Sequence, residues 1–286
     1  RLEDLTEAFD KFAYPQLKEW YAEDGGVRRS WGTVGDKLYG ITAEGPPFQT
    51  ARMIFIRKDW REDLGIAQPE TMNDVLSMAK AFKAVDPENR YGILITKDIL
   101  DNGMSDMFAI ANSMAVYPRR WIENDSGELV YGSLQPGMKD VLAVYRNLYE
   151  QGLINPEFAT TDGGNSAPQL TNGMVGIAPN AFWLYSWPLN SLFVSEGVEW
   201  ECYPVLPWEG YEGEIRVSTD RTQRKMVAVR KGYEHPEALV KVLNFEAYKL
   251  NDPEGNEQRF HSDEEYNYHM MMPFYPAFAP TKVNFD

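Results

Sequence analysis

An aromatic segment at residues 179–187 has the residue types that could hold a sugar. It reads Pro-Asn-Ala-Phe-Trp-Leu-Tyr-Ser-Trp and directly follows an apolar run, residues 174–178, that is typical of a strand. In open α/β sheets, ligands bind beyond the carboxyl ends of strands. A sugar packs its C–H face on aromatic rings and needs polar partners for its hydroxyls. We predict that Phe182 and Trp183 stack on a sugar and that Asn180 binds a hydroxyl. At least two of the four rings should belong to the core.

Other chemistry finds little support in the residues. The chain has no GxGxxG, Walker A, GxSxG or HExxH motif. Its three histidines have no second ligand at helical spacing, and the lone Cys202 excludes an internal disulfide and a cysteine zinc site. Residues 251–257 carry oxygen ligands, but not at a standard calcium spacing. We predict no catalytic residue, no metal site and no cofactor.

The composition narrows the classes of partner. With 43 acidic and 28 basic residues, the net charge is −15, so the chain repels nucleic acid and anionic lipid.

No apolar stretch approaches the ~18–20 residues of a membrane span. The length of 286 residues suggests two domains at roughly 150 residues each. The chain opens with Arg1 inside a predicted helix, and we interpret it as a fragment.

Helical patterns alternate with short strands, which predicts an α/β fold. Thr71 and Asp74 have the spacing of a helix-capping box. Trp60 stands at a predicted helix start, and we expect its ring to pack against the surrounding domain and not to bind ligand. Residues 160–168 are rich in Thr, Gly, Asn and Ser and are predicted to be an exposed loop. Strands are predicted at 36–41, 52–57, 91–95, 121–123, 128–131, 174–178 and 225–229, and helices at 2–12, 15–21, 72–85, 101–115, 136–151 and 236–248.

Several motifs, taken in order, resemble those of family 1 extracellular solute-binding proteins. Residues 36–41 (DKLYGI) are similar to the family's GKLYGIP strand, and residues 56–72 to its RKDWLDKLGL…PETMDE stretch. Residues 127–136 and 148–158 resemble GKVVYG…QP and LYKEGLIDPEF, and 172–177 and 235–245 fit as well. Each motif is weak alone, but the ordered series covers most of residues 35–250. The subgroup that it resembles is the LipO-type lipoproteins of Gram-positive bacteria.

The resemblance implies two hinged α/β lobes of the periplasmic-binding-protein type. Lobe 1 would comprise residues 1–52 and 217–286, and lobe 2 residues 53–216. The hinge crossings would lie near 53–55 and 215–217. Relative to the family, the chain lacks the opening strand–helix–strand and the C-terminal helices, so lobe 1 is expected to be incomplete. The loop at 86–90 is shorter than the family's calcium-binding loop, which argues against a structural calcium.

The function that the resemblance implies is capture of an oligosaccharide for an ABC importer. The partners would be the sugar and the membrane permease, and the protein would be a monomer. It would act outside a Gram-positive cell as a membrane-anchored lipoprotein, with signal and anchor absent from this fragment. We expect further ligand contacts from Glu44, Asp220, Arg221 and Tyr275, and a weaker one from Trp31. An ordinary solvated loop is the alternative interpretation of the charged residues.

Two functions of other classes stay open at this point. A carbohydrate-active hydrolase would use the same aromatic platform with two carboxylates ~5–10 Å apart. A protein-interaction module would use the aromatic rings as an interface. A binding protein binds sugar saturably without forming product, a hydrolase turns sugar over, and an interaction module does neither.

Overall fold

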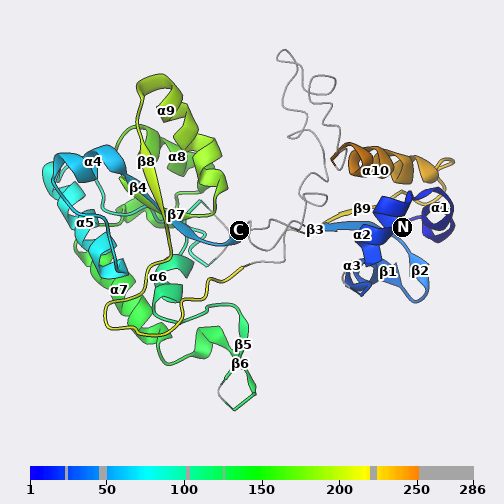
Figure 1. The fold of residues 1–286 in the computed structure, drawn as a ribbon, viewed down its shortest axis with the longest axis horizontal. Coiled ribbons are helices and arrows are strands. Elements are labelled where there is room, and N and C mark those ends of the chain that lie inside the picture. The colour runs from blue at the N-terminus through cyan, green and yellow to red at the C-terminus, as the bar shows by residue number, and fades with distance from the viewer. Residues whose placement is uncertain (23–24, 45–49, 101–103, 125, 220–223, 251–286) are drawn as a thin grey trace. The chain divides into compact units, whose positions relative to one another are not determined.

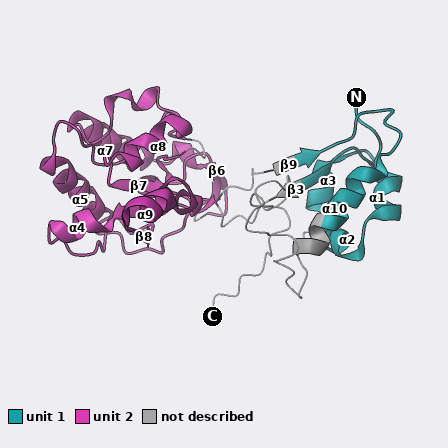
Figure 2. Ribbon diagram, turned by 90° about the horizontal axis from the view of Figure 1, so that it is seen from above, with its two compact units in different colours: residues 1–47, 220–286 teal, residues 48–219 magenta. Residues whose placement is uncertain are grey.

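Two compact units make up the chain. In the computed structural model, residues 1–22, 25–44, 50–100, 104–124, 126–219 and 224–250 are described. Unit 1 combines residues 1–47 with 220–286, and unit 2 is residues 48–219 (Figure 2). The fold mixes helices and strands, as the α/β prediction requires. The lobe limits at 52/53 and 216/217, and the hinge crossings beside them, stay predictions.

Unit 1 packs helices on a short sheet (Figure 1). Strand β3 pairs antiparallel with β9, and β1 with β2. Asn244 on α10 accepts a hydrogen bond from Tyr14 N at 2.8 Å and donates one to Phe12 O at 2.6 Å, which joins the first helices to a segment 230 residues later. The elements are α1 (Thr6–Phe12), α2 (Pro15–Ala22), α3 (Val27–Trp31), β1 (Thr33–Val34), β2 (Lys37–Leu38), β3 (Ile41–Glu44), β9 (Arg224–Val227) and α10 (Glu237–Leu250).

The first helix is shorter than predicted. The apolar spacing predicts a helix from residue 2, but α1 begins at Thr6, because the preceding residues pair elsewhere. Leu2 forms an antiparallel bridge with Arg230, and Leu5 N donates to Leu38 O at 2.7 Å. Asp4 Oδ1 then accepts from Thr6 N at 3.0 Å, at the point where the helix begins. Tertiary pairing therefore overrides the local pattern here.

Unit 2 is built on a three-stranded sheet in the order β7-β4-β8. Both neighbours run antiparallel to β4, so Met53 at its start lies opposite Asn180 and Pro204. The elements are β4 (Met53–Arg57), α4 (Lys58–Asp63), α5 (Met72–Val85), α6 (Phe108–Ser113), β5 (Trp121–Glu123), β6 (Leu129–Tyr131), η2 (Gly132–Leu134), α7 (Met138–Glu150), η3 (Pro156–Ala159), α8 (Gly163–Thr171), β7 (Ile177–Asn180), η4 (Tyr185–Leu189), α9 (Asn190–Glu196) and β8 (Trp200–Pro204).

Helix α5 confirms the local predictions. Thr71 Oγ1 accepts from Asp74 N at 3.2 Å, and Asp74 Oδ2 accepts from Thr71 N at 2.8 Å, which is the predicted capping box. The buried face of α5 contributes Val75, Ala79 and Phe82 to the main core of unit 2. Trp60 packs there too, as predicted, with its ring 5.4 Å from that of Phe82 at 88°.

Three predicted elements of unit 2 are wrong or too long. Residues 91–95 are not a strand, because their amides alternate between two segments. Tyr91 N and Leu94 N donate to the 174–177 segment, at Met174 O and Ile177 O, while Gly92 N and Ile93 N donate to Leu153 O. In the described part of residues 101–115, which is 104–115, helix is confined to α6. Residues 163–168 are helical instead of an exposed loop, because Asp162 Oδ1 caps α8 by accepting from Asn165 N at 2.9 Å.

Candidate functional site

The predicted strand at 174–178 lies at 177–180, as β7, so Pro179 and Asn180 belong to the strand and the aromatic rings begin just after it. The rings also point differently from the prediction. Phe182, Tyr185 and Trp187 are 48%, 50% and 53% exposed, and only Trp183 packs against a core cluster. The expectation that at least two of the four rings are core is therefore wrong. Ala181, Leu184 and Leu189 fill the inward positions, so the helical turns between them direct the rings to solvent. Three half-exposed rings next to one strand end form a surface on which an apolar face can stack.

Asn180 lies at the carboxyl end of β7 and is fully buried. Its Nδ2 donates to Met104 O, and its Oδ1 accepts from Ala181 N at 2.7 Å. The side chain thus ties the residue-104 segment to the strand end and fixes the turn that carries Phe182. Its predicted contact with a sugar hydroxyl stays a prediction.

A buried ion pair, which the sequence analysis missed, lies beside this turn. Arg52 directly precedes β4, and its Nε donates to Asp106 Oδ2 at 2.7 Å, with a second bond from Nη2. Arg52 Nη1 also donates to Thr50 O at 2.8 Å, and Asp106 Oδ1 accepts from Phe108 N at 3.0 Å. A charged residue at the edge of each of two apolar runs, 53–56 and 107–111, was the available signal.

The electrostatics of this pair follow from its burial. The Arg52 and Asp106 side chains are 3% and 0% exposed. Burial raises the pKa of the Asp106 carboxyl, and the positive charge of Arg52 acts against that rise. The Arg52 guanidinium carbon also lies 5.8 Å from the centroid of the Phe108 ring, and that of Arg120 lies 5.7 Å away on the same ring.

We call Arg52, Asp106, Asn180, Phe182 and Trp183 the strand-end site. The residues share one place because Met53, next to Arg52, is in register with Asn180. Their polar groups are matched internally, through the Arg52–Asp106 pair and the Asn180–Met104 link. The arrangement provides aromatic surface on a fixed backbone. It does not present two free carboxylates, as a glycosidase requires.

The remaining predicted site residues belong to unit 1 or lie outside the described residues. Glu44 ends β3, in backbone register with Arg224 of β9. Trp31 is the last residue of α3 and is partly buried. Asp220, Arg221 and Tyr275 lie outside the described residues. Whether any of these contacts ligand stays a prediction.

Neither a metal cluster nor a membrane span is found in the described ranges. No group of three or more His, Cys, Asp or Glu side chains there is arranged to hold a metal ion. At the shortened loop, Asp86 uses its carboxylate locally, since Oδ1 accepts from Asn89 N at 3.2 Å. Among these residues, each helix is too short or too polar to cross a bilayer.

Comparison with known proteins agrees with this architecture. The chain is 30% identical over 156 residues to lipoprotein LipO of Bacillus subtilis (strain 168), an alignment covering 51% of this chain and 29% of LipO. It is 27% identical over 150 residues to the polygalacturonan/rhamnogalacturonan-binding protein YtcQ of the same organism, again covering 51% of this chain and 29% of the relative. These alignments span less than a third of either relative.

A solved structure extends the likeness over almost the whole chain. The substrate-binding protein FusA of an S. pneumoniae ABC transporter, in complex with kestose, matches with a TM-score of 0.67 and 20% identity. The match covers 93% of this chain and 55% of FusA, so the chain spans about half of that structure. At this identity the match shows the fold alone: the two-lobe architecture of the solute-binding proteins.

The family assignment rests on a match along most of the sequence. The profile of the family described as Bacterial extracellular solute-binding protein matches residues 3–246. That range takes in all of unit 2 with the strand-end site, parts of both segments of unit 1, and the ordered motifs from residue 36 to 245. The chain belongs to the bacterial extracellular solute-binding proteins.

Proposed function

We propose that the protein is the substrate-binding component of an ABC importer and captures an oligosaccharide or related sugar. The observation that carries the proposal is the half-exposed aromatic segment on a fixed turn at the end of β7. Rings fixed in this way lose little freedom when a sugar stacks on them, so less of the binding free energy is spent on ordering.

The named relatives support a sugar as the ligand. YtcQ is named for binding polygalacturonan and rhamnogalacturonan, and FusA was solved with kestose. By analogy, the protein would act outside the cell as a membrane-anchored lipoprotein of a Gram-positive bacterium. Its partners would be the sugar and the membrane permease, and it would work as a monomer.

The mechanism follows from binding alone. No bond is made or broken, and no catalytic residue, metal or cofactor takes part. Phe182 and Trp183 stack on the sugar from the strand-end site, and Asn180 holds their turn or binds a hydroxyl. Contacts from the other lobe, with Glu44, Asp220, Arg221, Tyr275 and Trp31 as candidates, would favour the closed form. A sugar closes the lobes only if it binds the closed form more tightly than the open one.

A thermal-shift screen tests this function. The purified chain is heated with oligosaccharides, including kestose and oligogalacturonides, and each sugar is recovered and analysed afterwards. A ligand at ~100 times its Kd adds ~2.7 kcal/mol to the free energy of unfolding and raises Tm by several degrees. We expect a saturable shift with the sugar recovered intact. Shortened products would support the hydrolase instead.

A matched pair of variants locates the binding. Phe182→Ala should weaken the sugar about tenfold, since it removes a half-buried ring worth ~1.4 kcal/mol or more. Tyr149→Ala on α7 is the control, because Tyr149 is 47% exposed against 48% for Phe182 and lies outside the aromatic segment. Equal affinities for the two variants would contradict binding at the strand-end site.

A further inference from the structure

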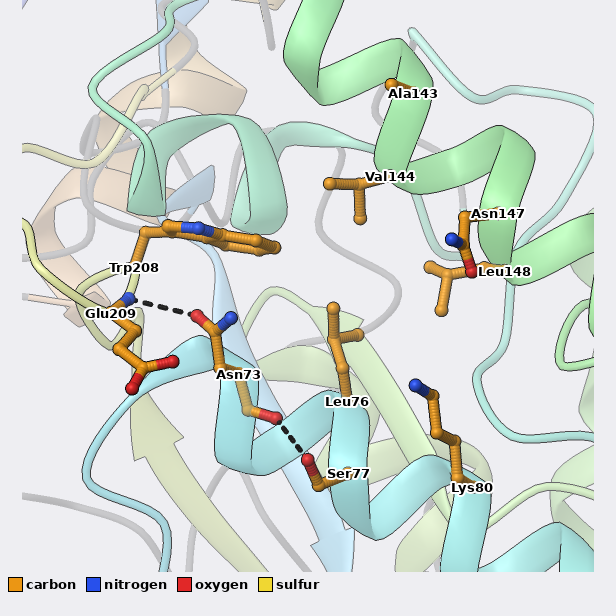
Figure 3. A pocket seen from close by; sticks show the side chains of 10 residues that line it. All are labelled: Asn73, Leu76, Ser77, Lys80, Ala143, Val144, Asn147, Leu148, Trp208 and Glu209. Atoms are coloured by element: carbon orange, nitrogen blue, oxygen red, sulfur yellow. Dashed lines mark hydrogen bonds between the residues drawn. The ribbon is translucent and has the colours of Figure 1, made fainter.

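A pocket on unit 2 lies away from the strand-end site. It has a volume of about 470 Å³ and lies between α5, α7 and residues 208–209. Figure 3 shows the Trp208 ring, Leu76 and Val144 around its interior, with Lys80 and Asn147 at one end. We call it the α5–α7 groove. Its volume is within the range of roughly 300–1,000 Å³ that is usual for small-molecule sites.

The aromatic wall of the groove is fixed by backbone hydrogen bonds. Trp208 N donates to Ser113 O at 2.9 Å, and Met72 N donates to Pro207 O at 2.8 Å. Glu209 N donates to the side-chain Oδ1 of Asn73 at 2.9 Å, as Figure 3 shows. The residues on both sides of Trp208 are thereby held to the start of α5. The ring is preformed as a surface and needs no ordering when a ligand arrives.

The polar end of the groove offers hydrogen-bond donors. Among the described residues, Lys80 Nζ has no hydrogen-bond or ion-pair partner, and in Figure 3 it points into the groove. Asn147 accepts from Gln151 through Oδ1, which leaves the two N–H groups of Nδ2 available. The groove's carboxylate, on Glu209, lies at the opposite end, beyond Asn73 (Figure 3).

This arrangement selects a particular kind of molecule. The wall of Trp208, Leu76 and Val144 suits an apolar face, while an ammonium and an amide N–H suit an acceptor that carries negative charge. A uronate, which is a sugar ring with a carboxylate in place of its terminal CH₂OH, has both. We propose that the α5–α7 groove is an accessory site for a uronate residue, with its ring against Trp208 and its carboxylate between Lys80 and Asn147.

The site is independent of the proposed sugar capture. None of the residues lining the groove belongs to the strand-end site. An accessory site of this kind would hold one acidic unit of a polymer while the strand-end site takes another. Two weak sites joined by one chain bind more tightly than either does alone.

Two-dimensional NMR of the labelled chain with sodium glucuronate tests the proposal. We expect saturable shifts of the Trp208 indole N–H, assigned with Trp208→Phe, and of the Asn147 side-chain amide. Glucose, which lacks the carboxylate, should bind at least about tenfold more weakly, as should glucuronate to Lys80→Met, because each loses a charge-assisted hydrogen bond. Lys139→Met on α7 is the control, since Lys139 is exposed and lies outside the groove lining.

Several outcomes would overturn the accessory site. The first is equal affinity for glucuronate and glucose. The second is equal weakening of glucuronate binding by Lys80→Met and Lys139→Met. The third is a set of NMR shifts that maps away from Trp208 and Asn147. The double variant Phe182→Ala/Trp183→Ala separates the two proposals. It should leave glucuronate binding in the groove unchanged, so loss of the strand-end function does not remove this result.

Discussion

Strand β4 has an arginine at each end, and the two ends differ in what surrounds the charge. Before β4, Arg52 pairs with Asp106, and their side chains are 3% and 0% exposed. At the last residue, Arg57 pairs with Asp59, and the side chains are 10% and 41% exposed. One end buries both charges, whereas the other leaves the carboxylate largely in water.

The aromatic rings show the opposite trend. Beside the buried Arg52 pair, the ring of Phe182 is half-exposed. Beside Arg57, the ring of Trp60 is 7% exposed, and the guanidinium carbon lies 4.8 Å from its centroid. At the end where the Phe182 ring is exposed, the Arg52 and Asp106 charges are paired inside the protein. The rings thus face solvent at the first end and pack into the core at the second, which fits the proposal that the first end contacts a ligand.

The largest difference between the ends should appear on breaking the ion pairs. Asp106→Asn leaves the Arg52 charge buried without its counter-charge, so we expect the free energy of unfolding to fall by about 3–5 kcal/mol. Asp59→Asn should lower the free energy of unfolding by less than about 1 kcal/mol, because the Arg57–Asp59 pair is partly solvated. Urea denaturation measures both. Similar losses would remove the distinction between the two ends.

The aromatic rings give the second test. Trp60→Ala should cost about 3 kcal/mol by leaving a cavity in the core. The packing is tight, since a Cβ added at Gly176 would lie 2.5 Å from the Trp60 ring. Phe182→Ala should cost less than about 1 kcal/mol. For sugar affinity the order should reverse. If Phe182→Ala proved the more destabilising in urea, its ring would be part of the core.

The pH dependence of stability tests the pair next to the Arg57 end. Arg61 Nε donates to Glu201 Oε2 at 2.8 Å, which lowers the pKa of that carboxyl. Its stabilising effect is therefore present above the ordinary pKa of glutamate and is lost as the pH falls through the lowered value. In thermal unfolding between pH 7 and pH 3, Glu201→Gln should be less stable at neutral pH, and the gap to the parent should close in acid. A gap that stays constant would contradict this.

The smallest effect is expected from an exposed pair near the same end. Lys58 Nζ lies 2.5 Å from Glu199 Oε2, with side chains 37% and 50% exposed. Because water screens both charges, Lys58→Met should leave the free energy of unfolding almost unchanged. Urea denaturation at low and high salt checks it. A loss near that of Asp106→Asn would show that exposure does not control the strength of these pairs.

The sequence predicts best where the interaction is local. Thr71 and Asp74 are three residues apart, so their capping box is readable from the residues, and the structure confirms it. Thr, Gly, Asn and Ser around 160–168 indicate a loop, yet Ser166 and Ala167 are buried in α8. There the cap at Asp162 and the packing of α8 produce a helix, although the composition favours a loop.

The strand-end site was predictable only in part. Phe182, Trp183 and Asn180 stand together in the sequence, and their place after a strand is visible there. The contacts that fix them are distant: Arg52 and Asp106 are 54 residues apart, and Asn180 and Met104 are 76 apart. The residue types indicate that a buried charge needs a partner, but they do not show which residue that partner is.

The path of the chain through the two units has a consequence for its synthesis. Strand β3 lies in the first part of unit 1, yet its partner β9 follows the whole of unit 2. Chains are made at ~5–20 residues per second, so β3 leaves the ribosome on the order of ten seconds or more before β9 exists. Asn244 and the Phe12 carbonyl that it binds are 232 residues apart. During that interval unit 2 is free to fold, while β3 still lacks β9, its partner among the described residues. A nascent chain stalled after unit 2 would therefore carry that unit complete and β3 without the strand that it pairs with in the finished fold, and strand edges left unpaired are sites of aggregation.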